Sequence, residues 1–254
     1  MDKVINLGIP HVGEKIFRSI GTPGLIKCLE VSETWKVLAE NVLVKRWKGK
    51  MFEACKSGKT QIVQLLLERC TSEESGLNIK DELGRTAFMW ACGNGHKDVV
   101  QLLLDNSKRI ELNARWNNGG TAFMWACFKG HKDVVKLLLD SNIELNARNY
   151  RGQSAFMYAC HNGHKDVVKL LLEHSERIDL NARTNLGCTA LMNACRNGQK
   201  DVVQLLLDHS ERIELNATSK NGNTAHMWAC QYGHRDVVKL LLEVSEVDIT
   251  LFTI

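Results

Sequence analysis

The chain has 254 residues, 44% hydrophobic and 24% charged, which is enough for one large folded domain or two smaller ones. The net charge of +4 comes from residues 1–50, which carry nine Lys and Arg against five Asp and Glu, whereas the remainder carries 24 of each kind. A neutral body argues against nucleic acid as a partner, because phosphate binding needs clustered cations.

The first residues, MDKVINLGIPHVGEKIF, lack the apolar run of a signal peptide. No stretch approaches the roughly 18 apolar residues that a membrane-spanning helix needs. The nine cysteines, an odd number, are therefore expected to be reduced thiols. We expect a cytoplasmic protein, with the nucleus as the alternative, that binds no membrane.

Residues 1–47 contain both prolines of the chain and three stretches whose apolar residues have helical spacing. In the first stretch Val12, Ile16 and Ile20 share one face. The second stretch runs from Leu25 to Val31, and the third begins at Trp35. We predict three short helices.

This spacing resembles the F-box, a motif that reads roughly L-P-x-E-[IV]-L-x-x-I-F-x-x-L and continues to V-[CS]-x-x-W. Aligned on Phe17, the apolar positions agree without a gap, but Pro10 lies one residue late and His11 replaces the usual acidic residue. The resemblance implies docking on the small Skp-type adaptor of a cullin-RING ubiquitin ligase. The residues that it assigns to this contact are Pro10, Val12, Ile16, Phe17, Leu25, Cys28, Val31 and Trp35. The alternative is a plain N-terminal cap over the segment that follows.

From residue 48 onward the sequence repeats itself with a period of 33 to 35 residues. The aligned copies are LGRTAFMWAC (83–92), NGGTAFMWAC (118–127), RGQSAFMYAC (151–160), LGCTALMNAC (186–195) and NGNTAHMWAC (221–230), and a partial copy precedes them at 50–70.

Each copy predicts a turn, a short helix, a second turn and a second helix. The glycine suits a tight turn, the Thr or Ser after it (Thr86 in the first full copy) is a good helix N-cap, and a second glycine ends the first helix. The apolar residues of HKDVVQLLL form a broad helical stripe. The segment LNAR is expected to run extended into the next turn. Stacked copies would bury a continuous core, as in a solenoid.

The copies resemble the ankyrin repeat, G-x-T-P-L-H-x-A-A-x-x-G-H-x-x-V-V-x-L-L-L followed by V-N-A. Alanine replaces the proline at the first helical position, and methionine replaces the histidine of the first turn. The resemblance implies an all-α fold, in which an F-box-like three-helix domain (1–47) continues into a solenoid of about six repeats (48–254). The expected boundaries are 48–80 for the partial repeat, then 81–115, 116–148, 149–183, 184–218 and 219–254.

Four copies place a cysteine four residues before a histidine, a spacing that also suits zinc ligands. The cysteine is present in all six copies, at 55, 92, 127, 160, 195 and 230, whereas the histidine becomes Lys59 and Gln199 in two of them. Ligands of one ion would be lost together, so we interpret the cysteines as small core residues and the histidines as hydrogen-bonding the turn. A thiol nucleophile also finds no paired base, so we expect no enzyme and no catalytic, cofactor or metal site.

Aromatic residues recur at one position of the first helix, and residues in the turns and after the cysteines differ between copies. In ankyrin-like proteins these positions line the concave, partner-binding face; free variation of an exposed surface is the alternative. The expected binding residues are Leu83, Arg85, Trp90, Asn94, Trp116, Asn118, Trp125, Phe128, Lys129, Tyr150, Arg151, Tyr158, His161, Asn162, Arg196, Asn197, Trp228, Gln231 and Tyr232.

Together the two resemblances imply a substrate-recognition adaptor of an SCF-type ubiquitin ligase. Its F-box would dock the Skp-type adaptor, and its repeats would hold an unknown protein substrate. The alternative is a non-degradative protein-binding scaffold or inhibitor whose N-terminus only caps the solenoid. In either case we expect a protein that is monomeric apart from its partners.

Overall fold

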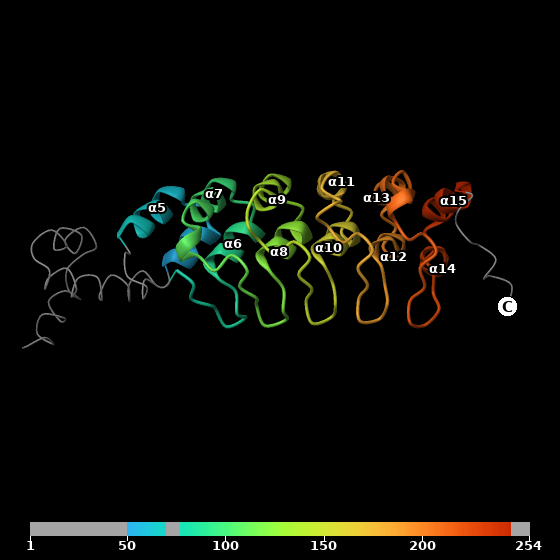
Figure 1. Cartoon of the computed structure of the whole chain (residues 1–254), viewed down its shortest axis with the longest axis horizontal. Helices are drawn as coiled ribbons and strands as arrows, with labels where there is room; N and C mark the ends of the chain where they lie inside the picture. The colour runs from blue at the N-terminus through green and yellow to red at the C-terminus, as the bar shows by residue number, and fades with distance from the viewer. Residues whose placement is uncertain (1–49, 70–76, 245–254) are drawn as a thin grey trace, which may run out of the picture.

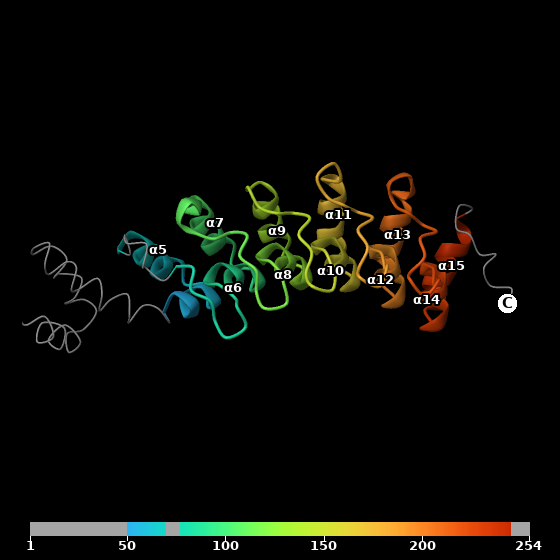
Figure 2. The ribbon, with the colours of Figure 1, turned by 60° about the horizontal axis from the view of Figure 1, so that its bottom comes forward.

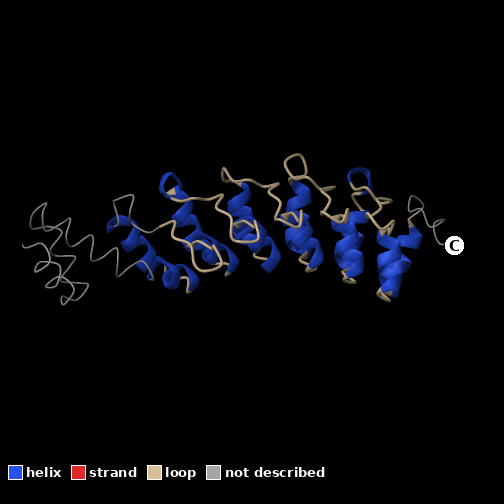
Figure 3. Ribbon diagram, turned by 90° about the horizontal axis from the view of Figure 1, so that it is seen from below, coloured by secondary structure: helices blue, strands red, loops and turns tan. Residues whose placement is uncertain are grey.

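The computed structural model describes residues 50–69 and 77–244, and these residues form a solenoid of stacked helix pairs (Figure 1). The F-box-like segment, with all its expected contact residues from Pro10 to Trp35, lies outside the described residues. Within the described ranges the regular elements are all helical, as Figure 3 shows, so the expected all-α class is confirmed there.

The helix pairs follow one another along the chain in a single direction. Residues 50–56 are helical and precede α5 (Thr60–Arg69). The pairs that follow are α6 (Ala87–Gly93) with α7 (Lys97–Asp105), α8 (Ala122–Lys129) with α9 (Lys132–Leu139), α10 (Ala155–His161) with α11 (Lys165–Glu173), α12 (Ala190–Arg196) with α13 (Lys200–Leu207), and α14 (Ala225–Gln231) with α15 (Arg235–Glu243). Short 3-10 helices follow α7 (η1, Ser107–Arg109) and α13 (η2, Ser210–Arg212).

The first helices of the pairs pack side by side in one row and the second helices in another (Figures 1 and 2). The long turns that precede the first helices project beyond the first row. Each turn is joined to the next by a backbone hydrogen bond, such as the one from Asn117 N to the carbonyl of Leu83 at 2.9 Å. The turns therefore form a ladder that runs along the row of first helices.

The predicted N-caps are confirmed. The hydroxyl of Thr121 accepts the backbone N–H of Met124 at 3.4 Å, and the equivalent Thr or Ser does the same in every full copy. Alanine begins each of these helices, as expected for the residue that replaces proline. The methionine three residues after the cap is buried in α6, α8, α10 and α12, so it fills the core at the position where the family has histidine.

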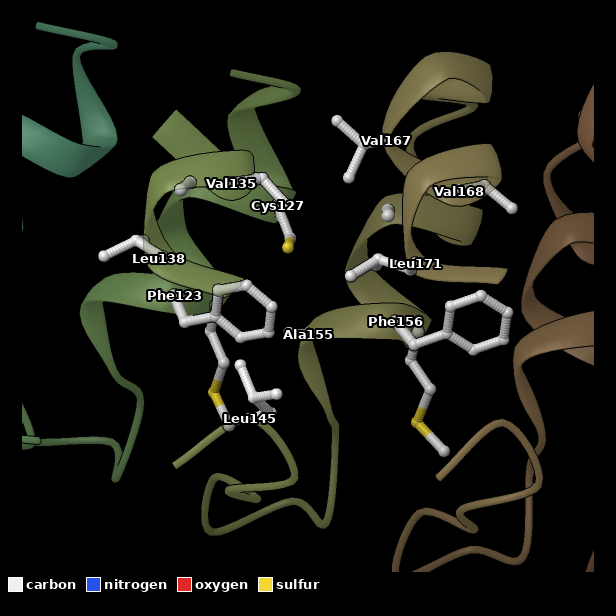
Figure 4. Packing of buried hydrophobic residues seen from close by; sticks show 14 of the residues in the cluster. Phe123, Cys127, Val135, Leu138, Leu145, Ala155, Phe156, Val167, Val168 and Leu171 are labelled. Atoms are coloured by element: carbon white, nitrogen blue, oxygen red, sulfur yellow. The ribbon is translucent and has the colours of Figure 1, made fainter. Parts of the chain in front are cut away.

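The core runs without a break between the two rows of helices (Figure 4). In α9, Val134, Val135, Leu138 and Leu139 are buried, and Phe123 of α8 packs against this stripe. The predicted stripe is narrower in α7, where the side chains of Leu102 and Leu104 are only half-buried.

The expectation for LNAR was partly wrong. Its first two residues form a turn, as at Leu145 and Asn146, and the residues after them have no regular secondary structure. The turn buries the leucine side chain and points the asparagine amide at the next pair, where Asn146 Oδ1 accepts the backbone N–H of Asp179 at 2.8 Å. The asparagine therefore fastens one helix pair to the next.

The expectation for the histidines also needs correction, because their partner lies in the preceding pair. His131 Nε2 lies 3.0 Å from the carbonyl oxygen of Gly93, and His96, His164 and His234 make the equivalent contact. Gln199 replaces histidine and donates its Nε2–H to the carbonyl of His161 at 3.1 Å. The histidine and its replacement therefore share one role, which is to join neighbouring pairs.

The interpretation of the cysteines as core residues is confirmed for Cys55, Cys92, Cys127, Cys160 and Cys195, which are fully buried. Cys230 is exposed, because it lies in the last pair of the described residues and no later described pair covers it. None of the helices in the described ranges has both the length and the apolar character needed to cross a membrane.

Candidate binding groove

Two adjacent pockets follow the surface between the turns and the first helices, and we call this surface the turn–helix groove. The aromatic pocket encloses about 420 Å³ and is lined by Leu83, Arg85, Trp116, Asn117, Asn118, Met124, Trp125, Phe128 and Tyr158. The polar pocket encloses about 400 Å³ and is lined by Arg151, Gln153, Thr184, Asn185, Leu186, Cys188, Asn193 and Arg196.

The floor of the aromatic pocket is a chain of rings from successive first helices. The ring centroids of Trp90 and Trp125 are 5.0 Å apart, and Trp116, from the turn, meets Trp125 edge-on at 5.8 Å. Phe128 meets Tyr158 edge-on at 5.6 Å on the other side of the pocket. Such rings combine a large contact area with few rotatable bonds, which makes them efficient anchors for a partner.

Two glycines leave the space that these tryptophans occupy. A Cβ atom at Gly93 would lie 2.5 Å from Cδ2 of Trp125, and one at Gly120 would lie 2.2 Å from Cζ2 of Trp116. Neither glycine has a positive φ, so the absence of a side chain, and not backbone freedom, is what these positions require. The other full copies have Phe128, His161, Arg196 and Gln231 in the place of Gly93. The aromatic pocket is thus specific to one part of the array.

A charged network at one end holds Trp90 and Arg85 in place. Asp81 Oδ2 accepts the Nε–H of Arg85 at 2.9 Å and the indole N–H of Trp90 at 3.2 Å. Burial raises the pKa of Asp81, but the hydrogen bonds from Arg85 and Trp90 and the charge of Arg85 outweigh it and hold the pKa below its usual range. The guanidinium also stacks 4.2 Å from the centroid of the Trp90 ring.

The polar pocket carries two arginines that have no carboxylate partner among the described residues. Arg151 and Arg196 are both exposed and form no ion pair within the described part of the chain. The charge of Arg196 also reaches His161, whose pKa is lowered first by burial and then by this neighbouring cation. His161 is therefore a neutral neighbour of the pocket at neutral pH.

Beyond the polar pocket, Arg196 bridges to a second group of rings. Its guanidinium lies 5.0 Å from the ring centroid of Trp228 and 5.1 Å from that of Tyr232. The indole N–H of Trp228 is buried and finds no acceptor among the described residues. This end of the groove differs from the Trp90 end, where Asp81 accepts the equivalent proton.

The predicted binding residues fall into distinct groups. The aromatic pocket brings together Leu83, Arg85, Trp116, Asn118, Trp125, Phe128 and Tyr158, and the polar pocket brings together Arg151 and Arg196. Trp90, Lys129, Tyr150 and His161 lie beside the pockets, and Trp228, Gln231 and Tyr232 lie in the last pair.

Three predicted residues have amides that are already engaged inside the chain. Asn162 Nδ2 donates to the carbonyl of Tyr158, Asn197 Nδ2 donates to that of Asn193, and Asn94 Nδ2 donates to that of Lys56. These asparagines close the ends of the first helices, which explains why the residue recurs after the cysteine. Their first contribution is to the structure of the array.

The expected binding residues do not include several residues that line the pockets: Asn117, Met124, Gln153, Thr184, Asn185, Leu186, Cys188 and Asn193. Five of them, Asn117, Gln153, Asn185, Leu186 and Cys188, are variable turn positions of the kind expected on the concave face, whereas no such signal in the sequence marks Met124 and Thr184. Asn193 interrupts the aromatic series, and this interruption marks the polar pocket.

The described residues contain no group of three His, Cys, Asp or Glu side chains placed to hold a metal ion. Burial raises the pKa of Cys55 to about 12 and raises the pKa values of Cys92 and Cys160 well above the usual range, so these thiols stay protonated.

The family model for ankyrin repeats matches three overlapping segments, at residues 51–149, 109–184 and 157–253. The chain belongs to the ankyrin-repeat family. An ankyrin-repeat array is a protein–protein interaction module, and its partners are proteins. The matched segments begin at residue 51, so they leave the F-box-like stretch uncovered.

Similar ankyrin-repeat segments occur in osteoclast-stimulating factor 1. The chain is 45% identical to the protein from Monopterus albus over 62 residues, which are 24% of this chain and 27% of the relative. It is 40% identical to that from Danio rerio over 65 residues (26% and 28%), and 36% identical to that from Sus scrofa over 97 residues (38% and 39%). The chain thus spans between a quarter and two fifths of the length of these relatives.

Proposed function

We propose that the protein is an adaptor whose ankyrin repeats hold a protein partner in the turn–helix groove. The observation that carries this proposal is the aromatic pocket, where tryptophans from neighbouring repeats meet over glycines that make room for them. An interface anchor needs a concave, partly apolar surface of this kind.

The F-box-like stretch extends the proposal to a substrate-recognition role in an SCF-type ubiquitin ligase in the cytoplasm. The support for this step is the spacing of Val12, Phe17, Val31 and Trp35 in the sequence. The segment would dock the Skp-type adaptor, and the groove would bring the substrate toward the ubiquitin-charged enzyme. Neither module needs chemistry of its own, because proximity raises the effective concentration of the substrate.

A pull-down of the full chain with purified Skp-type adaptor tests the ligase role. Wild type is expected to bind, and Phe17→Ala and Trp35→Ala are expected to lose binding while the helical signal in circular dichroism is unchanged. If wild type fails to bind the adaptor, the ligase role is wrong, and the alternative of a non-degradative scaffold or inhibitor remains.

A second pair of variants tests the groove independently. Protein partners captured from cell extract are expected to be retained by Phe17→Ala and lost by Trp125→Ala. Capture that does not change with Trp125→Ala would place the partner on another surface and overturn the groove proposal.

A further inference from the structure

The charges of the turn–helix groove are of one sign. The two pockets are lined by three arginines, Arg85, Arg151 and Arg196, and by no aspartate or glutamate. Asp81 neutralises Arg85 from beside the pocket, whereas Arg151 and Arg196 form no ion pair within the described ranges. Lys56, whose Nζ lies 4.9 Å from the Trp90 centroid, and Lys129, on the Phe128 ring, add cations at the edges.

The arginines of the LNAR segments, in contrast, are engaged within the chain. Arg115 pairs with Glu144 at 2.8 Å and Arg183 with Glu214 at 2.6 Å, and Arg148 donates to the carbonyls of Gly152 and Arg183. An unpaired guanidinium is a strong and directional ligand for a carboxylate, because its donors match the two oxygens.

The apolar and cationic parts of the groove are adjacent. Tyr158 lines the aromatic pocket, and its hydroxyl donates a hydrogen bond at 3.1 Å to Oε1 of Gln153, which lines the polar pocket. One extended segment of a partner can therefore contact both pockets.

We propose that the groove selects an acidic segment of its protein partner, with one bulky apolar side chain in the aromatic pocket and Asp or Glu carboxylates on Arg151 and Arg196. The pockets are centred roughly one to two helix-pair spacings apart, each about 8–10 Å. An extended chain rises about 3.3 Å per residue, so about two to six residues separate the apolar anchor from the carboxylates. This inference rests on the proposed function of the groove and adds the chemistry of the partner.

The experiment selects random dodecapeptides displayed on phage against the full-length protein, then measures the enriched peptides by fluorescence polarisation. The expected sequences combine Trp, Phe or Leu with an excess of Asp and Glu about two to six residues away. Affinity is expected to fall about tenfold or more with Trp125→Ala and with the double variant Arg151→Glu/Arg196→Glu. It is also expected to fall with rising salt.

A control with the same change of net charge is Lys136→Glu/Lys169→Glu, because both lysines are exposed on second helices and line neither pocket. This control is expected to keep the affinity within about twofold of wild type, since charges beyond a Debye length are screened. Selection repeated on Arg151→Glu/Arg196→Glu is expected to favour Lys and Arg in place of Asp and Glu.

The two proposals fail differently. Two results would contradict the inference of an acidic partner while the proposed binding groove stands. In the first, the peptides need Trp125 but show no excess of acidic residues. In the second, the excess of acidic residues persists when selection is repeated on Arg151→Glu/Arg196→Glu. Selected peptides whose binding is unchanged by Trp125→Ala would overturn both.

Discussion

Helix α8 contains two phenylalanines that belong to different parts of the molecule. Phe123 is 2% exposed and repeats as Phe88 and Phe156, whereas Phe128 is 38% exposed and is replaced by a different residue in every other full copy. Phe123 lies in the core between neighbouring pairs, and the two remaining full copies have Leu191 and His226 at this position, both of which are also buried. Phe128 faces the turn–helix groove, where no neighbour in the chain dictates its identity.

The difference shows that repetition within this chain separates two kinds of constraint. Positions that face another copy are filled mostly by similar residues, because every copy presents a similar surface to the next. The position directly after the cysteine differs in every full copy, and two of its residues, Gly93 under Trp125 and Phe128 in the lining, help to form one aromatic pocket.

Truncation of the two phenylalanines should give the largest contrast. Phe123→Ala is expected to lower the free energy of unfolding by about 3–5 kcal/mol, because it leaves a cavity in the core. Phe128→Ala is expected to change it by about 0.5 kcal/mol or less and to weaken the binding of a groove peptide. Urea unfolding followed by far-UV circular dichroism measures both. Equal losses would show that Phe128 belongs to the core.

Filling the space under Trp125 should give the next largest effect. Gly93→Ala is expected to destabilise the protein by about 1–3 kcal/mol, because the added methyl group displaces the indole ring. The displacement should also change the tryptophan emission spectrum. Gly222→Ala is the control: its φ of +77° makes alanine unfavourable by about 1–2 kcal/mol, but no atom lies within 4 Å of an added Cβ atom. An unchanged emission spectrum in Gly93→Ala would contradict the close contact.

The contacts between neighbouring pairs should contribute less. His131→Ala is expected to lower the free energy of unfolding by about 1 kcal/mol through the lost contact with the carbonyl of Gly93. His131→Gln should retain most of this stability, because Gln199 makes the equivalent bond in its own pair. Thermal unfolding of the two variants checks the comparison, and a glutamine variant as unstable as the alanine variant would count against it.

The smallest effect is expected where an ion pair lies outside both core and groove. Arg115 and Glu144 are 2.8 Å apart, but both side chains are largely exposed. Glu144→Ala should therefore change the free energy of unfolding by less than about 0.5 kcal/mol, and the change should shrink further in 0.5 M salt. A loss of more than 1 kcal/mol in chemical denaturation would show that this pair helps to hold the turns together.

Local features of the sequence predicted much of the fold. The Thr and Ser caps, the helix pairs and the buried cysteines follow from patterns within a few residues, and the structure has them where they were expected. Contacts between pairs could not be predicted in the same way. The sequence shows that the histidine at position 131 recurs in four of the five full copies, but not that its partner is a carbonyl 38 residues earlier.

The candidate groove shows the same limit. The aromatic series and the variable positions identified much of its lining, but a variable glycine gives no indication of the ring that lies over it. Gly93 and Trp125 are in different copies, so the role of this glycine becomes visible only when the copies are stacked. The sequence shows which positions differ between copies, whereas the shape of a pocket depends on which of these residues become neighbours in the stacked array.

The histidine and glutamine contacts run from each pair to the one before it, from His96 to Lys56 as well as from His234 to Arg196. The array is therefore directional. During synthesis on the ribosome, the carbonyl at the end of each first helix is made before the histidine or glutamine side chain of the next pair that contacts it. Each repeat is completed by its successor, so ordered structure can advance behind the ribosome one repeat at a time, in the direction in which the chain emerges.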